Sequence, residues 1–186
     1  MIIGEKIVLV PFEDWNAGEI RRWMSDPYYR FYFKNMPEML NAAQLRDFPK
    51  IMGMNVLMIY DRGQWEASFT EQFTPTPIGL CSWDNVRFLA KSCELGIIID
   101  KDASGKHYGR EAIFLFLDYL FNRLGLHKVS AHTAAEANDT NTKAMEVVGF
   151  QFESIVRDNF YMDGKWHDEK RLSILDSEFK GIKKGE

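Results

Sequence analysis

The stretch Glu94-Leu-Gly-Ile-Ile-Ile-Asp100, followed by Lys101-Asp-Ala-Ser-Gly-Lys-His-Tyr-Gly109, decides the fold of this chain of 186 residues. Its apolar first part is typical of a buried strand, whereas the second part has no periodicity and contains two glycines. From Arg110 to Phe121 apolar residues recur at the spacing of an amphipathic helix, which Gly125 would end. A strand that leads through such a loop into a helix predicts an anion site, because backbone N–H groups and the helix dipole favour negative charge.

The charge of this loop is opposite to that of the whole chain. Residues 101–110 carry three basic side chains (Lys101, Lys106, Arg110) and one acidic one, Asp102, whereas the chain has 23 basic and 27 acidic residues and a net charge of −4. The local excess of positive charge suits a pyrophosphate; the alternative is an ordinary connection with a solvated face. The acidic balance of the whole chain argues against nucleic acid as a partner.

Composition and motifs exclude several classes of protein. Apolar residues make up 46% of the chain, which is enough for one full core, and the two cysteines, Cys81 and Cys93, form no disulfide framework. No apolar run is long enough for a signal peptide or a membrane span, so we expect a cytoplasmic protein without a membrane partner. There is no P-loop or Rossmann string, and the four histidines have no metal-ligand spacing, so no metal is predicted.

The hydrophobic pattern predicts a mixed α/β chain with a largely antiparallel front half. The expected strands are 6–10, 55–60, 77–83, 92–100, 128–133, 150–158 and 167–175. The expected helices are 14–25, with Asp14 as N-cap, 42–52, weakened by Pro49, 110 to the region of Gly125, and 140–148. Residues 61–76 are expected to be a loop, and Asp163-Gly164 predicts a hairpin turn.

Four patches, in order along nearly the whole chain, resemble the GNAT acyltransferase superfamily, in particular its ribosomal-protein N-terminal acetyltransferases. The patches are Gly4–Asp14 with Trp23–Pro27, Glu94–Asp100 with Gly105–Ala112, Asn138–Phe150, and Asp163–Asp168. The resemblance implies one domain over residues 1–176 with a tail over 177–186. It also implies a mixed, mostly antiparallel sheet of about seven strands flanked by about four helices.

The same resemblance implies the activity. An acetyl group would pass from acetyl-CoA, the cosubstrate, to a primary amine on a protein N-terminus or a small molecule by direct attack. The alternative is a catalytically inert module of the same fold that binds CoA or a protein partner. A monomer or homodimer is expected.

Cofactor contacts follow from the resemblance position by position. Loop amides would hold the CoA pyrophosphate, the strand Glu94–Ile99 would splay from its neighbour to hold the pantetheine, and two asparagines would contact CoA unless they are plain helix N-caps. The implied cofactor-binding residues are Ile97, Ile98, Ile99, Gly105, Lys106, His107, Tyr108, Gly109, Arg110, Asn138 and Asn141.

Three positions depart from the family pattern. Asp102 and His107 stand where the signature Gln/Arg-x-x-Gly-x-Gly/Ala has a neutral or basic residue and a small residue. Met145 lies near the position where many relatives have a tyrosine that protonates the leaving thiolate. These departures support the alternative of an inert module.

Glu94 is the leading candidate for the general base. It lies on the strand that would hold the thioester, and apolar neighbours can raise the pKa of such a carboxyl toward neutrality. The alternative is that Glu94 lies at a sheet edge or pairs with a lysine. Glu111 is more simply explained as a first-turn helix acid.

The acceptor side is expected around the aromatic run Tyr28-Tyr29-Arg30-Phe31-Tyr32-Phe33. Tyrosines combine an apolar ring with a polar tip, so Tyr28, Tyr29, Phe31 and, on the terminal hairpin, Tyr161 are predicted to bind the substrate. His167 is a weaker candidate. The alternative is that half of the aromatic run simply packs in the core.

Overall fold

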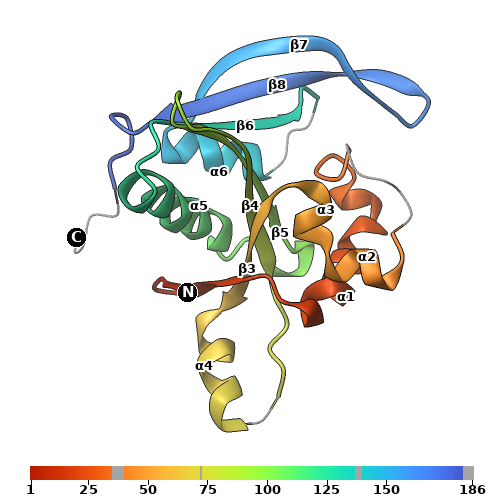
Figure 1. Ribbon diagram of the computed structural model, residues 1–186, viewed down its shortest axis with the longest axis vertical. Helices are drawn as coiled ribbons and strands as arrows, with labels where there is room; N and C mark the ends of the chain where they lie inside the picture. Colours follow the sequence, from red (N-terminus) through yellow and green to blue (C-terminus); the bar gives the residue numbers. More distant parts are fainter. Residues whose placement is uncertain (35–39, 72, 137–139, 182–186) are drawn as a thin grey trace.

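The computed structural model describes residues 1–34, 40–71, 73–136 and 140–181, without the side chains of residues 140 and 141. These residues form one eight-stranded sheet in the order β1-β2-β3-β4-β5-β6-β8-β7 (Figure 1). The strands are β1 (Ile2–Ile3), β2 (Ile7–Pro11), β3 (Asn55–Asp61), β4 (Gly79–Arg87), β5 (Ser92–Ile99), β6 (Lys128–Ala134), β7 (Gln151–Met162) and β8 (Lys165–Leu175).

Neighbouring strands in this sheet are antiparallel, except that β5 and β6 are parallel. The parallel ladder runs from Ser92–Lys128 to Leu95–Ala131 and ends there, although both strands continue. Beyond that point β5 follows β4 and β6 follows β8, so the sheet opens between them (Figure 1). We call this opening the fork. The predicted splay of the strand Glu94–Ile99 from its neighbour agrees with this geometry.

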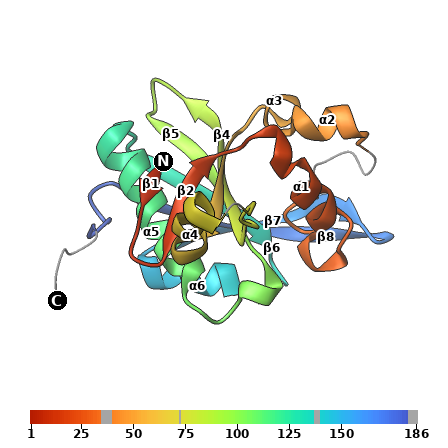
Figure 2. The same ribbon diagram turned by 90° about the horizontal axis from the view of Figure 1, so that it is seen from below.

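Helices cover both faces of the sheet (Figures 1 and 2). They are η1 (Asp14–Asn16), α1 (Ala17–Met24), η2 (Pro27–Tyr29), α2 (Ala42–Arg46), α3 (Phe48–Met52), α4 (Arg62–Glu71), η3 (Lys101–Ala103), α5 (Tyr108–Asp118), the π-turn η4 (Tyr119–Arg123) and α6 (Thr140–Val148). One core cluster joins α5 and α6 to the sheet, and a second joins α1–α3 to the opposite face. Successive side chains of β5 alternate between them, since Ile97 belongs to the first cluster and Ile98 to the second.

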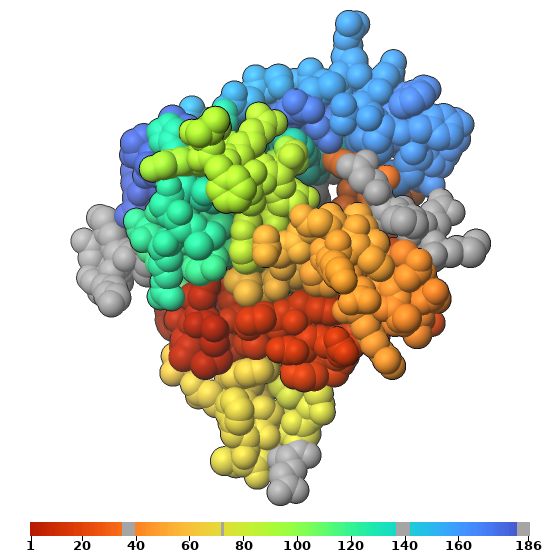
Figure 3. Space-filling model, viewed as in Figure 1, coloured from red at the N-terminus to blue at the C-terminus, as the bar shows by residue number. Residues whose placement is uncertain are grey.

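The expected loop over residues 61–76 is wrong, because residues 62–71 form the helix α4, which projects from the body of the molecule (Figures 1 and 3). Asp61 caps this helix by accepting a hydrogen bond from the amide of Gln64 at 3.0 Å, and Arg62 pairs with Glu66 one turn later. No residue of α4 is fully buried. The apolar periodicity that reveals a packed helix is therefore missing from its sequence.

Two further expectations about local structure need correction. Asp14 lies inside the turn η1, whose N-cap is Glu13, with the Glu13 amide donating to Asn16 Oδ1 at 2.9 Å. The single helix over 42–52 is divided into α2 and α3, because Pro49 fits the first turn of a helix but not its interior. The hairpin turn is confirmed, with Asp163 and Gly164 both at positive φ.

Candidate active site

The glycine-bearing loop leads from the end of β5 to the first turn of α5, as the sequence predicts. Gly105 and His107 have φ angles of 84° and 66°, and the space around the missing Cβ of Gly105 is open. The helix starts at Tyr108, so its free amides face the loop. Lys106 and Arg110 are exposed beside it. A helix start with positive side chains and an open glycine fits a diphosphate group.

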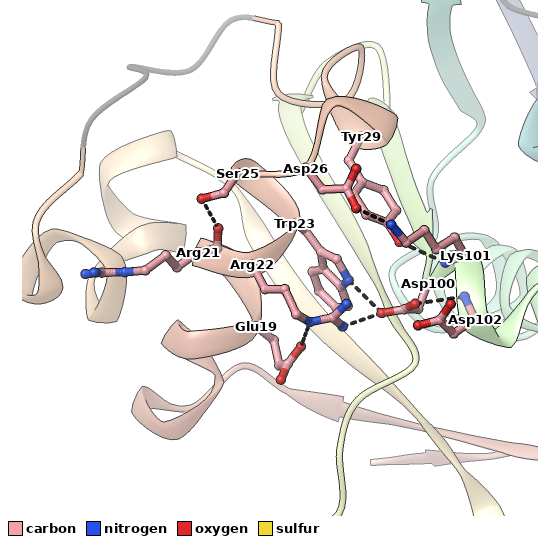
Figure 4. Close-up of polar contacts among 10 residues, drawn as sticks. All are labelled: Glu19, Arg21, Arg22, Trp23, Ser25, Asp26, Tyr29, Asp100, Lys101 and Asp102. Atoms are coloured by element: carbon pink, nitrogen blue, oxygen red, sulfur yellow. Dashed lines mark hydrogen bonds and ion pairs between the residues drawn. The ribbon is translucent and has the colours of Figure 1, made fainter.

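The sequence overestimates the free positive charge of this loop. The ammonium group of Lys101 forms an ion pair with Asp26 at 2.6 Å (Figure 4), so one of the three cations is already neutralised. Lys106 and Arg110, which are exposed, remain to attract an anion. Asp102 is exposed, and its backbone amide donates to Asp100.

Among the other predicted cofactor residues are three isoleucines of β5 and two asparagines near α6. Ile97 and Ile98 are buried, and Ile99 lies 3.1 Å from the ideal Cβ position of Gly109, so strand and helix are in close contact at the loop. Asn138 lies outside the described residues, and Asn141 lies in α6 without a described side chain.

Glu94 lies at the fork in a cluster of charged groups. Its Oε1 accepts a hydrogen bond from Asn85 Nδ2 at 2.7 Å, and its Oε2 lies 3.6 Å from His132 Nδ1. The same histidine nitrogen lies 3.7 Å from Glu169 Oε1. His132 is the first residue of β6 beyond the end of the parallel ladder, so this cluster lies where the two strands separate.

The charge states in this cluster follow from burial. Burial, together with the charges of Arg171 and Lys34, lowers the pKa of His132 although the two nearby carboxylates act to raise it, which favours the neutral imidazole at neutral pH. Asp84 pairs with Glu94 across β4 and β5, and its pKa is raised first by burial and then by the charge of Glu94. Asp84 and Glu94 thus place two acidic side chains next to each other at the fork, where they would attract a cationic amine.

The aromatic run over residues 28–33 is mainly part of the core. Tyr29 and Phe33 are buried, and Tyr28 is 58% exposed with its ring edge-on to that of Tyr29. Tyr32, which the sequence did not single out, lies over Gly96 on β5, where an added Cβ would come within 2.8 Å of its ring. Its hydroxyl is 2.7 Å from Ser82 Oγ. Tyr32 thus contacts β5 immediately beyond Leu95, where the parallel ladder ends.

Phe31 and the terminal hairpin are joined by a second aromatic group. The rings of Phe31 and Phe160 both pack on His167, which is 3% exposed and bonded to Glu136 and to the carbonyl of Met162. This imidazole is held close to the turn of the hairpin, since its strand partner Phe160 is two positions before Met162.

Tyr161 is 60% exposed and packs on Trp166. Its predicted contact with substrate stays a prediction, as does that of Phe31.

Several other side chains that the sequence analysis considered are used in packing or in structural hydrogen bonds. Met145 is buried in the core, where it has no proton to give, and Glu111 accepts a hydrogen bond from the backbone amide of Lys6 at 3.0 Å. Both cysteines are buried, and burial raises the pKa of Cys93 to about 12 and that of Cys81 further. Neither thiol is a reactive nucleophile.

Lys34 connects the aromatic run to the fork through Glu169, which lies 135 residues further along the chain, so no local sequence pattern indicates this contact. Its ammonium lies 2.8 Å from Glu169 Oε2, and the two side chains are 8% and 4% exposed. Arg171 also contacts this carboxylate, with Nε 3.2 Å from Oε1. Burial raises the pKa of Glu169, but these cations, with Lys34 first, bring it below its ordinary value.

The depressed pKa of Glu169 predicts acid sensitivity, and Asp100 shares this property. The stability that these two carboxylates contribute is complete above their pKa values in the unfolded chain. It is lost as the pH falls through their pKa values in the folded protein. We expect the free energy of unfolding to decrease below about pH 5, and to decrease less steeply in Glu169→Gln. Urea denaturation at several pH values, followed by tryptophan fluorescence, measures how the free energy of unfolding depends on pH in the wild type and in Glu169→Gln. The same pH dependence in both proteins would contradict the charged state assigned to Glu169.

The fold and the site together define a class of protein. In this class the sheet separates at its one parallel pair of strands, and a loop suited to an anion follows the strand that separates. The chain belongs to the family described as Acetyltransferase (GNAT) domain, whose model matches residues 6–151. Acetyl-CoA is the cosubstrate of these acetyltransferases. Among the described residues, no helix combines the length and apolar character needed to cross a bilayer.

Two curated relatives have similar sequences. Spermidine N(1)-acetyltransferase of Vibrio cholerae is 35% identical over 102 residues, which are 55% of this chain and 58% of that protein. The putative ribosomal N-acetyltransferase YdaF of Bacillus subtilis is 32% identical over 105 residues, 56% of this chain and 57% of that protein. The aligned region thus spans a little over half the length of each relative.

A solved structure supports the fold over most of the chain. Spermidine N-acetyltransferase from Vibrio cholerae, in complex with CoA and spermine, superposes with a TM-score of 0.78 at 23% identity, covering 94% of this chain and 98% of that one. At this identity the likeness bears on the fold alone.

Proposed function

We propose that this protein is an acetyl-CoA-dependent N-acetyltransferase whose acceptor is a primary amine on a small polycation of the polyamine class. The observation that carries the acceptor class is a cluster of two acidic side chains at the fork, Asp84 and Glu94, which are register partners on β4 and β5. Ammonium groups are attracted to such a cluster, whereas an anionic acceptor would be repelled. The relative from Vibrio cholerae named for spermidine supports the same class.

The residues of the loop fit the cosubstrate. The amides at the start of α5, with Lys106 and Arg110, would hold the diphosphate of CoA. The pantetheine would extend along β5 beyond Leu95, where the parallel ladder ends. The acetyl thioester would then reach the fork, close to Glu94 and His132. These assignments, with those of Asn138 and Asn141, remain part of the proposal.

The chemistry proposed for the fork is direct transfer. The neutral amine nitrogen attacks the thioester carbonyl carbon, a C–N bond forms and the C–S bond breaks, and a backbone N–H stabilises the oxyanion. Glu94 accepts the proton lost by the amine, directly or through a water molecule, and its side chain is 32% exposed, so the proton can pass to solvent. The CoA thiolate takes a proton from solvent, and the products are the N-acetylated amine and CoA.

A panel of acceptors tests this proposal. We expect release of free CoA thiol from acetyl-CoA with spermidine and spermine, and at least tenfold lower kcat/KM with a neutral peptide N-terminus or an amino sugar, because only the polyamine presents several positive charges. Acetyl-CoA, but not ATP, should also raise the melting temperature, since a ligand that binds the native state stabilises it by mass action.

The competing functions give different outcomes in the same panel. Thiol release with peptide N-termini alone would indicate the ribosomal-protein branch, which the similarity to YdaF favours. A thermal shift with CoA and no thiol release with any amine would indicate an inert CoA-binding module. The absence of a thermal shift at millimolar acetyl-CoA would exclude all three.

A further inference from the structure

A buried carboxylate lies at the point where β5 ends and the anion loop begins. Asp100 is 5% exposed and accepts hydrogen bonds from Trp23 Nε1 at 3.0 Å, from Arg22, and from the backbone amide of Asp102 at 3.0 Å (Figure 4). Burial alone would raise its pKa, but these three donors bring the pKa below its ordinary value. The carboxylate is therefore charged at neutral pH, and both of its oxygens accept hydrogen bonds.

The next residue is held to the same helical segment by both its main chain and its side chain. The amide of Lys101 donates to the hydroxyl of Tyr29 at 2.8 Å, and its ammonium pairs with Asp26 at 2.6 Å (Figure 4). Asp26 in turn caps η2 by accepting from the amide of Tyr28. We call the contacts of Asp100 and Lys101 with residues 22–29 the loop anchor.

The loop anchor connects two segments that are far apart in the sequence. Arg22 and Asp100 are 78 residues apart, and Trp23, which is fully buried, holds the anchor rigidly against the second core cluster. The rest of the loop contains residues at positive φ, Gly105 and His107, and only a short turn, η3. The conformation of the loop thus depends on where its first residues are fixed.

We propose that Asp100 is a positioning residue for the cosubstrate: it sets the path of the loop 101–107 so that the amides before α5 converge on one anion. This inference rests on the proposed function, because the anion is taken to be the diphosphate of acetyl-CoA. The residues at the fork that are proposed to bind the acceptor are held by other contacts, such as the ion pair between Lys34 and Glu169. Loss of the anchor should therefore weaken cosubstrate binding and leave acceptor binding nearly unchanged.

The experiment compares Asp100→Ala, Asp100→Asn and Tyr29→Phe with the wild type. We expect the Kd for CoA, measured by calorimetry, and the KM for acetyl-CoA to rise about tenfold in Asp100→Ala. Both constants should rise less in Asp100→Asn, which keeps an oxygen that can accept from Trp23 Nε1. They should also rise less in Tyr29→Phe, which removes only the hydroxyl that accepts from the Lys101 amide. In the two Asp100 variants the KM for the polyamine and kcat should stay within about twofold of the wild type.

A matched control separates positioning from a general loss of stability. Tyr60→Phe removes a buried hydrogen bond of similar kind, from Asn16 Nδ2 at 2.7 Å, in the same core cluster, and this bond has its partner in η1 rather than in the loop. It should lower the melting temperature without changing the KM for acetyl-CoA. If Asp100→Ala does not fold, Tyr29→Phe carries the test alone.

The failures of the two proposals are distinguishable. A wild-type protein that does not bind CoA would overturn the proposed function and this inference together. Binding of CoA by the wild type, with unchanged affinity in both the Asp100 variants and Tyr29→Phe, would overturn only the positioning role. An equal rise in the KM values for both substrates, with the same rise in Tyr60→Phe, would also overturn it.

Discussion

Replacing Glu94 with glutamine is expected to lower kcat at pH 7 by about 10²- to 10⁴-fold, the usual contribution of a general base. Glutamine keeps the size of the side chain and an oxygen for the hydrogen bond from Asn85, but it cannot accept a proton. The loss should be smaller at pH 9, where a larger fraction of the amine is already deprotonated. Steady-state thiol release at the two pH values measures this difference.

Two variants provide the controls for Glu94. Glu66→Gln makes the same chemical change on the projecting helix α4, where Glu66 pairs with Arg62, and should leave kcat unchanged. Asn85→Ala removes the hydrogen bond to Glu94 but keeps the carboxylate, so it should cost far less than Glu94→Gln. An equal loss of activity at pH 7 and pH 9 in Glu94→Gln would reject the role as base.

Replacing Lys34 with methionine is expected to lower the free energy of unfolding by about 3 kcal/mol. The ammonium of Lys34 lies 2.8 Å from Glu169 and 4.9 Å from the centre of the Phe160 ring, in a position that is almost fully buried. Methionine fills much of the space but leaves the carboxylate of Glu169 with Arg171 as its remaining close cation. Removing the nearer cation of a buried ion pair leaves the carboxylate only partly compensated, which is the main source of the loss.

The control for Lys34 is an exposed ion pair on the same sheet. Lys128 lies 2.8 Å from Glu153, with the two side chains 36% and 46% exposed, so Lys128→Met should cost less than about 1 kcal/mol. The double variant Lys34→Met with Glu169→Gln should recover part of the stability lost in Lys34→Met. Urea denaturation measures all four proteins, and equal losses in the two lysine variants would contradict the buried-pair argument.

Local features of the site were predictable from the sequence because they depend on residues that are close along the chain. The loop 101–109 and the helix after it follow from glycine placement and apolar periodicity, and the hairpin turn follows from Asp163-Gly164. The helix α4 could not be predicted in this way, because none of its residues is fully buried and its sequence therefore has no apolar periodicity.

The sequence by itself determined the order of strands and helices, the anion loop and the membership of an acyltransferase superfamily, since these depend on local patterns and motifs. Only the tertiary structure decided which charges meet. The register of β5 against β6 places Glu94 near His132, and chain packing brings Lys34 to Glu169, 135 residues away. Burial then sets the protonation of these groups, and burial depends on the elements packed around them rather than on neighbours in the sequence.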